Sequence, residues 1–202
     1  MIVTLASVKG GVGKSTCAIH IAAYLRSLAS TLLVDSDRIR SCVAWSKRGQ
    51  LPFPVVDENH QAKAMRDTRY DYVVFDTPGS IDDQGLMELA DGCDLMIVPA
   101  VPESSATDGL LYTLRRIQRG KGEFGVLLNR VRHNRPQEAT ELREAIAATG
   151  ARVFTTAIPD LVAFDKASAQ GIPVYDVDDR RAARAWEAFE ALGKEITNGE
   201  TQ

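Results

Sequence analysis

The sequence lacks a long hydrophobic run. None of its apolar stretches approaches the roughly 20 residues that a helix needs to cross a bilayer. Residues from Met1 onward enter an apolar strand pattern at once, without the basic segment and apolar core of a signal peptide. We therefore expect a cytoplasmic protein that does not attach to a membrane.

The sequence also has few cysteines and no strong excess of one charge. Cys17, Cys42 and Cys93 are odd in number, far apart and without metal-ligand spacing, so they are interpreted as reduced core thiols. The net charge of −3 does not indicate a nucleic-acid binder by itself, although a whole-chain value can hide a local patch.

The remaining composition is that of an ordinary globular domain. The chain is 45% hydrophobic and 25% charged, as in ordinary soluble domains. Its 202 residues are enough to form one sizeable core. No internal repeat, low-complexity segment or linker interrupts the chain. We predict a single domain over residues 1–197 and a disordered tail over residues 198–202.

Short apolar runs alternate with longer amphipathic segments. Most runs are continuously apolar, as in strands covered on both faces: Ile2–Ser7, Leu32–Asp35, Phe53–Val56, Tyr72–Asp76, Leu95–Val98, Gly125–Asn129 and Val153–Thr156. Helical spacing is found in Ser15–Leu28, Thr107–Ile117, Gln137–Ala148 and Asp178–Ile196. This alternation predicts an α/β fold, a doubly wound and mostly parallel sheet flanked by helices.

A glycine-rich loop follows the first predicted strand. It consists of Lys9, Gly10, Gly11, Val12, Gly13, Lys14, Ser15 and Thr16. Glycines allow several backbone N–H groups to point at one anion, and the following helix adds its positive N-terminal end. Lys14 is expected to reach the β- and γ-phosphates, and the Ser15 hydroxyl to bind Mg²⁺. The loop predicts a P-loop NTPase that binds ATP.

The loop departs from the strict phosphate-binding motif at one position. Val8 stands where the first glycine is usual, and Lys9 follows it. In this it resembles the deviant Walker A loop of the ParA/MinD family, and the resemblance covers nearly the whole chain. The resemblance implies a homodimer with ATP sandwiched between two chains, in which Lys9 touches the phosphates bound by the other chain. A cation supplied in this way stabilises charge during phosphoryl transfer.

Two carboxylates end the second predicted strand. Asp35 and Asp37 are two apart, so on a strand both would face the same way, toward the edge where ligands bind. The resemblance implies that Asp35 supports Mg²⁺ through water and that Asp37 orients or deprotonates the attacking water. One of them acting only as a helix cap is the alternative. Arg38 and Ile39 replace the Pro-Gln that the family carries next, which affects the local geometry.

A third carboxylate ends the predicted strand Tyr72–Asp76. Asp76 is followed by a turn that contains Gly79, which resembles a Walker B strand with a switch loop. Asp76 is expected to hold the Mg²⁺ shell, directly or through water. Gly79 would allow a loop that responds to the γ-phosphate.

Two later strand ends are candidates for the base of the nucleotide. The resemblance implies that Asn129 and the pair Pro159 and Asp160 frame the adenine ring. An Asn amide has both a donor and an acceptor, which suits reading of the exocyclic amine.

A local basic segment lies between residues 115 and 135. Seven positive side chains and only one acid, Glu123, give this segment a charge of +6: Arg115, Arg116, Arg119, Lys121, Arg130, Arg132 and Arg135. Such a patch could bind DNA without reading its sequence, in a salt-dependent manner. A solvated helix face and loop is the alternative.

We therefore interpret the chain as an ATPase that dimerises with ATP, binds nonspecific DNA and so associates with the nucleoid. A ParB-like or other small adaptor protein would stimulate hydrolysis, and the cargo would be a plasmid, a chromosome or another cellular body. A membrane-associated positioning ATPase of the MinD kind is the second interpretation, although the polar segment after the last helix disfavours it. A metabolic P-loop enzyme is the third.

Overall fold

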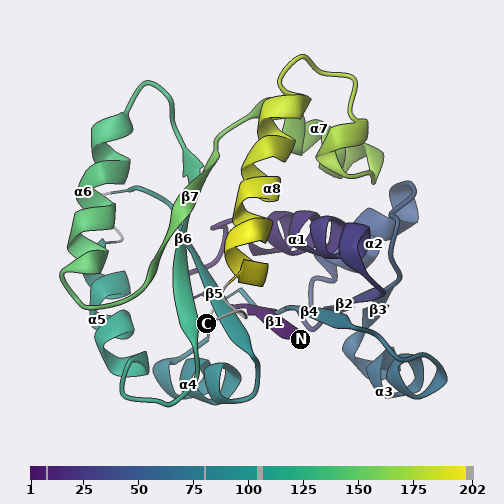
Figure 1. Ribbon diagram of the computed structural model, residues 1–202, viewed down its shortest axis with the longest axis horizontal. Helices are drawn as coiled ribbons and strands as arrows, with labels where there is room; N and C mark the ends of the chain where they lie inside the picture. The colour runs from purple at the N-terminus through teal and green to yellow at the C-terminus, as the bar shows by residue number, and fades with distance from the viewer. Residues whose placement is uncertain (8, 80, 104–106, 199–202) are drawn as a thin grey trace.

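The computed structural model describes residues 1–7, 9–79, 81–103 and 107–198. Its strands are β1 (Ile2–Leu5), β2 (Thr31–Asp35), β3 (Val55–Asp57), β4 (Tyr72–Asp76), β5 (Leu95–Ala100), β6 (Phe124–Val131) and β7 (Val153–Pro159). They form one sheet in the order β3-β2-β4-β1-β5-β6-β7, and every pair is parallel (Figure 1). The α/β class predicted from the sequence is confirmed.

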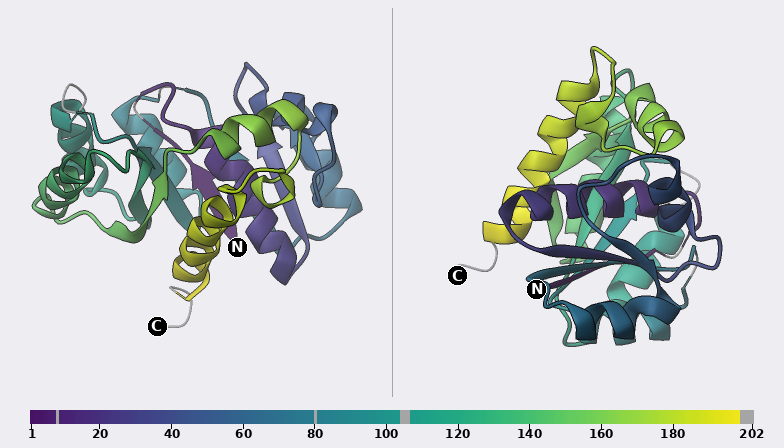
Figure 2. Two further views of the ribbon diagram at one scale, coloured as in Figure 1. Left: turned by 90° about the horizontal axis from the view of Figure 1, so that it is seen from above. Right: turned by 90° about the vertical axis from the view of Figure 1, so that its right-hand side faces the viewer.

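Helices cover both faces of this sheet. They are α1 (Lys14–Leu28), α2 (Ser41–Arg48), α3 (Glu58–Asp67), α4 (Asp83–Asp91), α5 (Thr107–Ile117), α6 (Pro136–Ala147), α7 (Val162–Gln170) and α8 (Ala182–Asn198), with the short 3₁₀ helix η2 (Val174–Asp176). The core cluster on one face comes from α1, α2, α7 and α8, and those on the other face from α3 to α6. Figure 2 shows these two layers on opposite sides of the sheet.

Burial on both faces explains the continuous apolar runs. All five residues of β2 and all six of β5 are buried. Leu33 packs into the cluster beneath α1, while its neighbours Leu32 and Val34 pack into the cluster on the opposite face. A strand with two dry faces has no polar side to alternate with, and the sequence pattern follows from that.

Several helix boundaries differ from the sequence prediction. Helix α5 has the predicted bounds, whereas α8 begins at Ala182 and reaches Asn198, the first residue of the predicted tail. The rest of that tail, and Val8 in the phosphate loop, lie outside the described residues. None of the helices in the described part of the chain has the length and apolar content that a bilayer crossing requires.

The strand order places the predicted site residues at one edge of the sheet. Strand β1 lies centrally, between β4 and β5, and its chain continues into the phosphate loop. The carboxyl ends of β2, β4, β6 and β7 lie at the same edge because all the strands are parallel. Ligands of open α/β sheets bind at this edge, beside the point where the strand order reverses.

Candidate nucleotide-binding site

The phosphate loop is held in shape by glycines and by one amide. Gly13 is the residue before α1 and has a φ of 87°, which side chains rarely adopt. A Cβ on Gly13 would lie 2.4 Å from Asn129 Nδ2. That same Nδ2 donates a 2.7 Å hydrogen bond to the carbonyl of Val12. The end of β6 therefore braces the loop directly, and only glycine leaves room for the contact.

Lys14 is already aimed inward at the start of α1. Its side chain is buried, and Nζ donates a 3.0 Å hydrogen bond to Ser7 Oγ. Ser7 in turn donates to the Lys9 carbonyl at 2.8 Å. Burial lowers the pKa of Lys14, and the nearby carboxylates of Asp76 and Asp37 oppose that effect. Phosphate oxygens could replace Ser7 as the partner of this ammonium group.

Asp76 has the features of a cation-binding carboxylate. It is fully buried at the end of β4, and Cys42 Sγ lies 3.2 Å from its Oδ2. Its Oδ1 is buried with no hydrogen-bond partner among the described residues. Burial raises the pKa of Asp76 to about 6, opposed by the Ser15 hydroxyl and the Cys42 thiol. An unpartnered buried carboxylate oxygen beside a serine hydroxyl fits an Mg²⁺ ion.

The remaining Mg²⁺ ligands must come from elsewhere. No group of three or more His, Cys, Asp or Glu side chains within the described ranges could hold a metal ion on its own. Mg²⁺ is commonly bound by one or two carboxylates together with substrate phosphates and waters. The site therefore fits an ion that arrives with a nucleotide.

Asp35 and Asp37 occupy different positions. Strand β2 ends at Asp35, so the alternation of a strand does not extend to Asp37, which lies in the following loop. Asp35 is fully buried and accepts backbone N–H groups from Asp37 at 3.2 Å and from Val43 at 3.0 Å. Burial raises its pKa, and these N–H groups oppose the rise. Asp35 thus fixes the loop, whereas Asp37 lines the large pocket described next.

A pocket of 620 Å³ lies on the α1 side of the phosphate loop. Its lining includes Gly13 to Thr16, Asp37, and the predicted base-binding residues Asn129, Pro159 and Asp160. We call it the nucleotide pocket. Asn129 already gives one donor to Val12, and Asp160 pairs with Arg130 at 3.6 Å. Apart from Val12, which lines a second cavity, the predicted phosphate-binding and base-binding residues therefore meet in one cavity large enough for a nucleotide.

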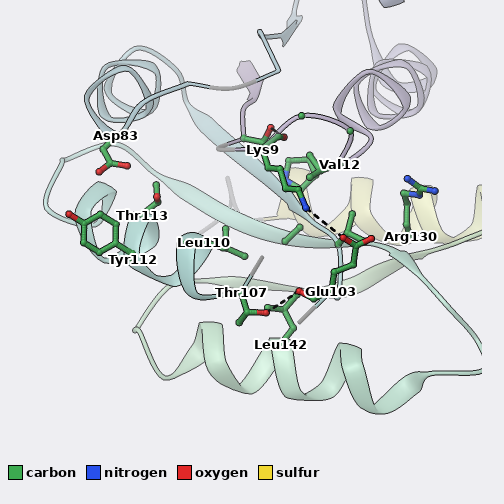
Figure 3. Close-up of a pocket in the computed structure, with 17 residues that line it drawn as sticks. Lys9, Val12, Asp83, Glu103, Thr107, Leu110, Tyr112, Thr113, Arg130 and Leu142 are labelled. Atoms are coloured by element: carbon green, nitrogen blue, oxygen red, sulfur yellow. Dashed lines mark hydrogen bonds and ion pairs between the residues drawn. The ribbon is translucent and has the colours of Figure 1, made fainter. Parts of the chain in front are cut away.

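Lys9 lies in a second cavity. This cavity of 560 Å³ is lined by the outer side of the phosphate loop, the segment after β5, and helices α5 and α6. We call it the Lys9 cavity. Figure 3 shows Lys9 reaching across it to Glu103, with Nζ 3.6 Å from Oε2. Lys9 does not line the nucleotide pocket of its own chain.

The predicted basic segment is divided by β6. All seven of its positive residues are exposed: Arg115, Arg116, Arg119, Lys121, Arg130, Arg132 and Arg135. Four precede β6 and three come at or after its end, and an eight-residue strand is about 23 Å long. Arg116, Arg130 and Arg135 pair with Asp83, Asp160 and Glu138. Arg130 also lines both cavities, so it belongs to the nucleotide site more than to a basic surface.

Two residues near the site were not predicted to belong to it. Cys42 contacts Asp76 across 34 positions of sequence, and His20 fixes α1 to the C-terminal segment. The His20 Nδ1–H donates to the Thr16 carbonyl at 2.7 Å, and Nε2 accepts from the Val174 N–H at 3.0 Å. Neither residue carries a local signal, because each contact depends on how distant segments pack.

Comparison with known proteins agrees with this geometry. The family model described as CobQ/CobB/MinD/ParA nucleotide binding domain matches residues 3–174. The chain is 28% identical over 201 residues to the maintenance of carboxysome distribution protein A of Gloeobacter kilaueensis, covering 96% of this chain and 93% of that protein. It is 30% identical over 214 residues to the chromosome-partitioning ATPase Soj of Thermus thermophilus, covering 84% and 85%.

A solved structure shares the fold. The MinD cell division protein of Aquifex aeolicus superposes with a TM-score of 0.76 at 17% identity, covering 98% of this chain and 96% of that one. At that level of identity the likeness concerns the arrangement of strands and helices alone.

Proposed function

The chain belongs to the CobQ/CobB/MinD/ParA nucleotide-binding family, and on this premise we propose that it is a ParA-type ATPase that dimerises around ATP to position a cargo. Two similar proteins are named for chromosome partitioning and for carboxysome distribution, and both names describe placing a large body. One observation carries the proposal: Lys9 lies outside its own nucleotide pocket. A phosphate-loop cation that does not face its own nucleotide is available to a neighbouring chain.

The nucleotide pocket supplies the binding contacts for ATP. Backbone N–H groups of the glycine loop and the N-terminus of α1 would surround the phosphates. Lys14 would exchange Ser7 for the β- and γ-phosphates. The Ser15 hydroxyl and Asp76 Oδ1 would hold Mg²⁺, which when bound neutralises phosphate charge.

Hydrolysis needs a positioned water molecule. Asp37 lines the nucleotide pocket and is available to orient that water, because Asp35 takes the Asp37 N–H and fixes the loop. Asp35 acts here as a positioning residue. Lys9 of the second chain would then add positive charge where negative charge develops on the transferred phosphoryl group.

Dimerisation would release Lys9 from Glu103. Both side chains are about half exposed, 55% and 45%, so their ion pair is worth at most about 1 kcal/mol. A triphosphate bound by another chain offers more negative charge than one carboxylate. Lys9 would therefore leave Glu103 for the phosphates of the other chain only when ATP is bound there. This exchange would favour the dimer in the ATP-bound state.

Sedimentation tests the dimer. Wild type, Lys9→Ala and Asp37→Ala are compared with ATP and Mg²⁺, with ADP as the control nucleotide. We expect Asp37→Ala to form a stable dimer with ATP, because hydrolysis no longer reverses it, and Lys9→Ala to stay monomeric. Monomers for both wild type and Asp37→Ala with ATP would rule out the sandwich dimer.

Nonspecific DNA is the proposed surface to which the ATP-bound form attaches, which would place the protein on the nucleoid. Four of the exposed basic residues have no ion pair with any described residue: Arg115, Arg119, Lys121 and Arg132. Phosphate contacts of this kind release counterions, so binding should weaken steeply as salt rises. Release would follow hydrolysis stimulated by a ParB-like or other small adaptor protein.

DNA binding is tested with ATP at several salt concentrations. We expect Arg119→Ala combined with Lys121→Ala to weaken binding and to reduce its salt dependence, relative to the exposed control Lys63→Ala on α3. Binding of the ATP form to anionic liposomes but not to DNA would favour a membrane-positioning ATPase of the MinD kind instead.

A further inference from the structure

An exposed loop stands at the rim of the nucleotide pocket. Ile39 is 80% exposed although it is apolar, and it lines that pocket. Arg38 beside it is exposed and forms no ion pair within the described ranges. These two residues form what we call the rim loop.

The rim loop is rigidly presented. The Ile39 N–H donates to Asp37 Oδ1 at 2.9 Å, and the Arg40 guanidinium donates to the Asp35 carbonyl. Arg40 itself takes a left-handed conformation with a φ of 57°, a strained state for a residue other than glycine. These contacts hold the backbone of the loop in one conformation, in which the Ile39 side chain is exposed.

The Lys9 cavity has the complementary character. Its lining includes the apolar residues Pro99, Val101 and Leu110 and the acids Asp83 and Glu103. Figure 3 shows Glu103 beside Lys9 and Asp83 farther away. Asp83 pairs with Arg116 at 2.7 Å, and Glu103 pairs only with Lys9 among the described residues. Departure of Lys9 would leave Glu103 without a cation in a cavity that is also lined by apolar residues.

Symmetry brings the rim loop and this cavity together. The nucleotide pocket and the Lys9 cavity share Gly10, Gly11 and Arg130, so they lie on either side of the phosphate loop. In a two-fold dimer each contact occurs twice in exchanged form. If Lys9 of one chain reaches the phosphates of the second, the nucleotide pocket of the second faces the Lys9 cavity of the first. The rim loop of the second chain then also faces the Lys9 cavity of the first, because Ile39 lines the nucleotide pocket.

We propose that the rim loop of one chain docks in the Lys9 cavity of its partner, a second copy of this chain. Ile39 packs against Val101 and Leu110, and Arg38 pairs with the Glu103 that Lys9 has left. This inference rests on the proposed ATP-dependent dimer. It adds an exchange of ion pairs, in which Glu103 holds Lys9 in the monomer and Arg38 of the second chain in the dimer.

A charge swap tests the pairing of Arg38 with Glu103. Dimer dissociation constants are measured by sedimentation with ATP in an Asp37→Asn background, which removes the carboxylate proposed for hydrolysis but keeps the Oδ1 that accepts the Ile39 N–H. We expect Arg38→Glu and Glu103→Arg each to weaken the dimer about tenfold or more, because like charges then meet at both copies of the contact. The double variant should return to within about threefold of the background. Lys63→Glu on α3, an exposed charge reversal away from the loop, is the matched control.

Crosslinking tests the location directly. One chain carries Ile39→Cys and the other Tyr112→Cys, a 59% exposed residue of the Lys9 cavity, with Cys93→Ser in both. A short bis-maleimide should join the two chains with ATP and not with ADP. Met65→Cys, on an exposed apolar residue of α3, replaces Ile39→Cys in the control.

The outcomes separate this inference from the proposed function. An Asp37→Asn protein that stays monomeric with ATP overturns the dimer and the docking together. A dimer that forms normally, but shows no rescue in the double variant and no crosslink from position 39, overturns the docking of the rim loop and leaves the ATPase dimer standing.

Discussion

The thiol of Cys42 lies 3.2 Å from Oδ2 of Asp76, and this contact leaves Oδ1 as the free oxygen of a buried carboxylate. Cys42 is itself fully buried at the start of α2, and burial and the nearby carboxylates raise its pKa well above the usual range. It therefore stays protonated and donates. A buried thiol thus orients the carboxylate toward the proposed Mg²⁺ position.

Replacement of Cys42 should change the demand for Mg²⁺. Cys42→Ala removes the donor, so the pKa of Asp76 should rise further and the Mg²⁺ concentration for half-maximal ATPase activity should increase several-fold. Cys42→Ser keeps a donor and should stay near wild type. Cys93→Ala, a thiol away from this site, is the control. Equal Mg²⁺ dependence in all four proteins would contradict a positioning role.

The apolar pattern of the sequence predicted the architecture, whereas the contacts that position the site residues depend on how distant segments pack. Continuous apolar runs located the strands, and the spacing of Leu110 and Leu114 gave α5 its bounds. Helices α2, α3, α4 and α7 were not predicted, because each has ten residues or fewer and so offers a short periodic pattern. Helix α3 has no buried residue that would mark an apolar stripe. The sequence does not show that Asp35 holds the loop after β2, because that contact depends on where β2 ends and on the position of the Val43 N–H.

Gly13 should be intolerant of any side chain. Its φ of 87°, and the 2.4 Å that would separate an added Cβ from Asn129 Nδ2, imply strain and displacement of the loop brace. We expect Gly13→Ala to abolish measurable ATP binding by calorimetry and to lower the free energy of unfolding by about 1–3 kcal/mol.

The control for this change is Gly109→Ala on α5. A Cβ there meets nothing within 4 Å, and the backbone is helical. That variant should bind ATP normally and gain up to about 1 kcal/mol in stability. Similar ATP affinities for the two variants would contradict the role given to the loop geometry.

Asn129 should matter through its donor. Asn129→Asp keeps the shape but replaces the N–H that bonds to Val12 with an acceptor, and it adds negative charge beside the phosphates. We expect ATP affinity to fall by about tenfold or more, since a buried acceptor pair and a like charge both oppose binding. Asn134→Asp, exposed in the turn after β6, is the matched control in the same fluorescence titration.

His20 should make stability depend on acidity. Burial lowers its pKa to about 4 from an ordinary value of 6.5, opposed by its hydrogen bond to Thr16. The unfolded chain therefore binds the extra proton first as pH falls, so the stability contributed by His20 is complete above about pH 6.5 and lost by pH 4. The difference between the two pKa values corresponds to about 3 kcal/mol.

The measurement must separate His20 from Asp76. The raised pKa of Asp76 gives a slope of opposite sign at the same pH. Denaturant unfolding of wild type and His20→Leu from pH 7 to pH 4 isolates the histidine, because the Asp76 contribution cancels in the difference. The stability deficit of His20→Leu relative to wild type should be largest at pH 7 and should shrink as the pH falls to 4. His133→Gln, an exposed histidine, should keep the wild-type slope.

The position of Lys9 in a cavity apart from its own nucleotide has a kinetic consequence. In the proposed arrangement the catalytic site of a single chain lacks a lysine. Only an encounter between two ATP-loaded chains brings Lys9 of each chain to the nucleotide of the other. At low abundance the active form then rises with the square of the concentration. A shallow gradient of monomers along a cell therefore becomes a steeper gradient of active dimers. The activity of the protein then depends on its own local concentration without any added receptor.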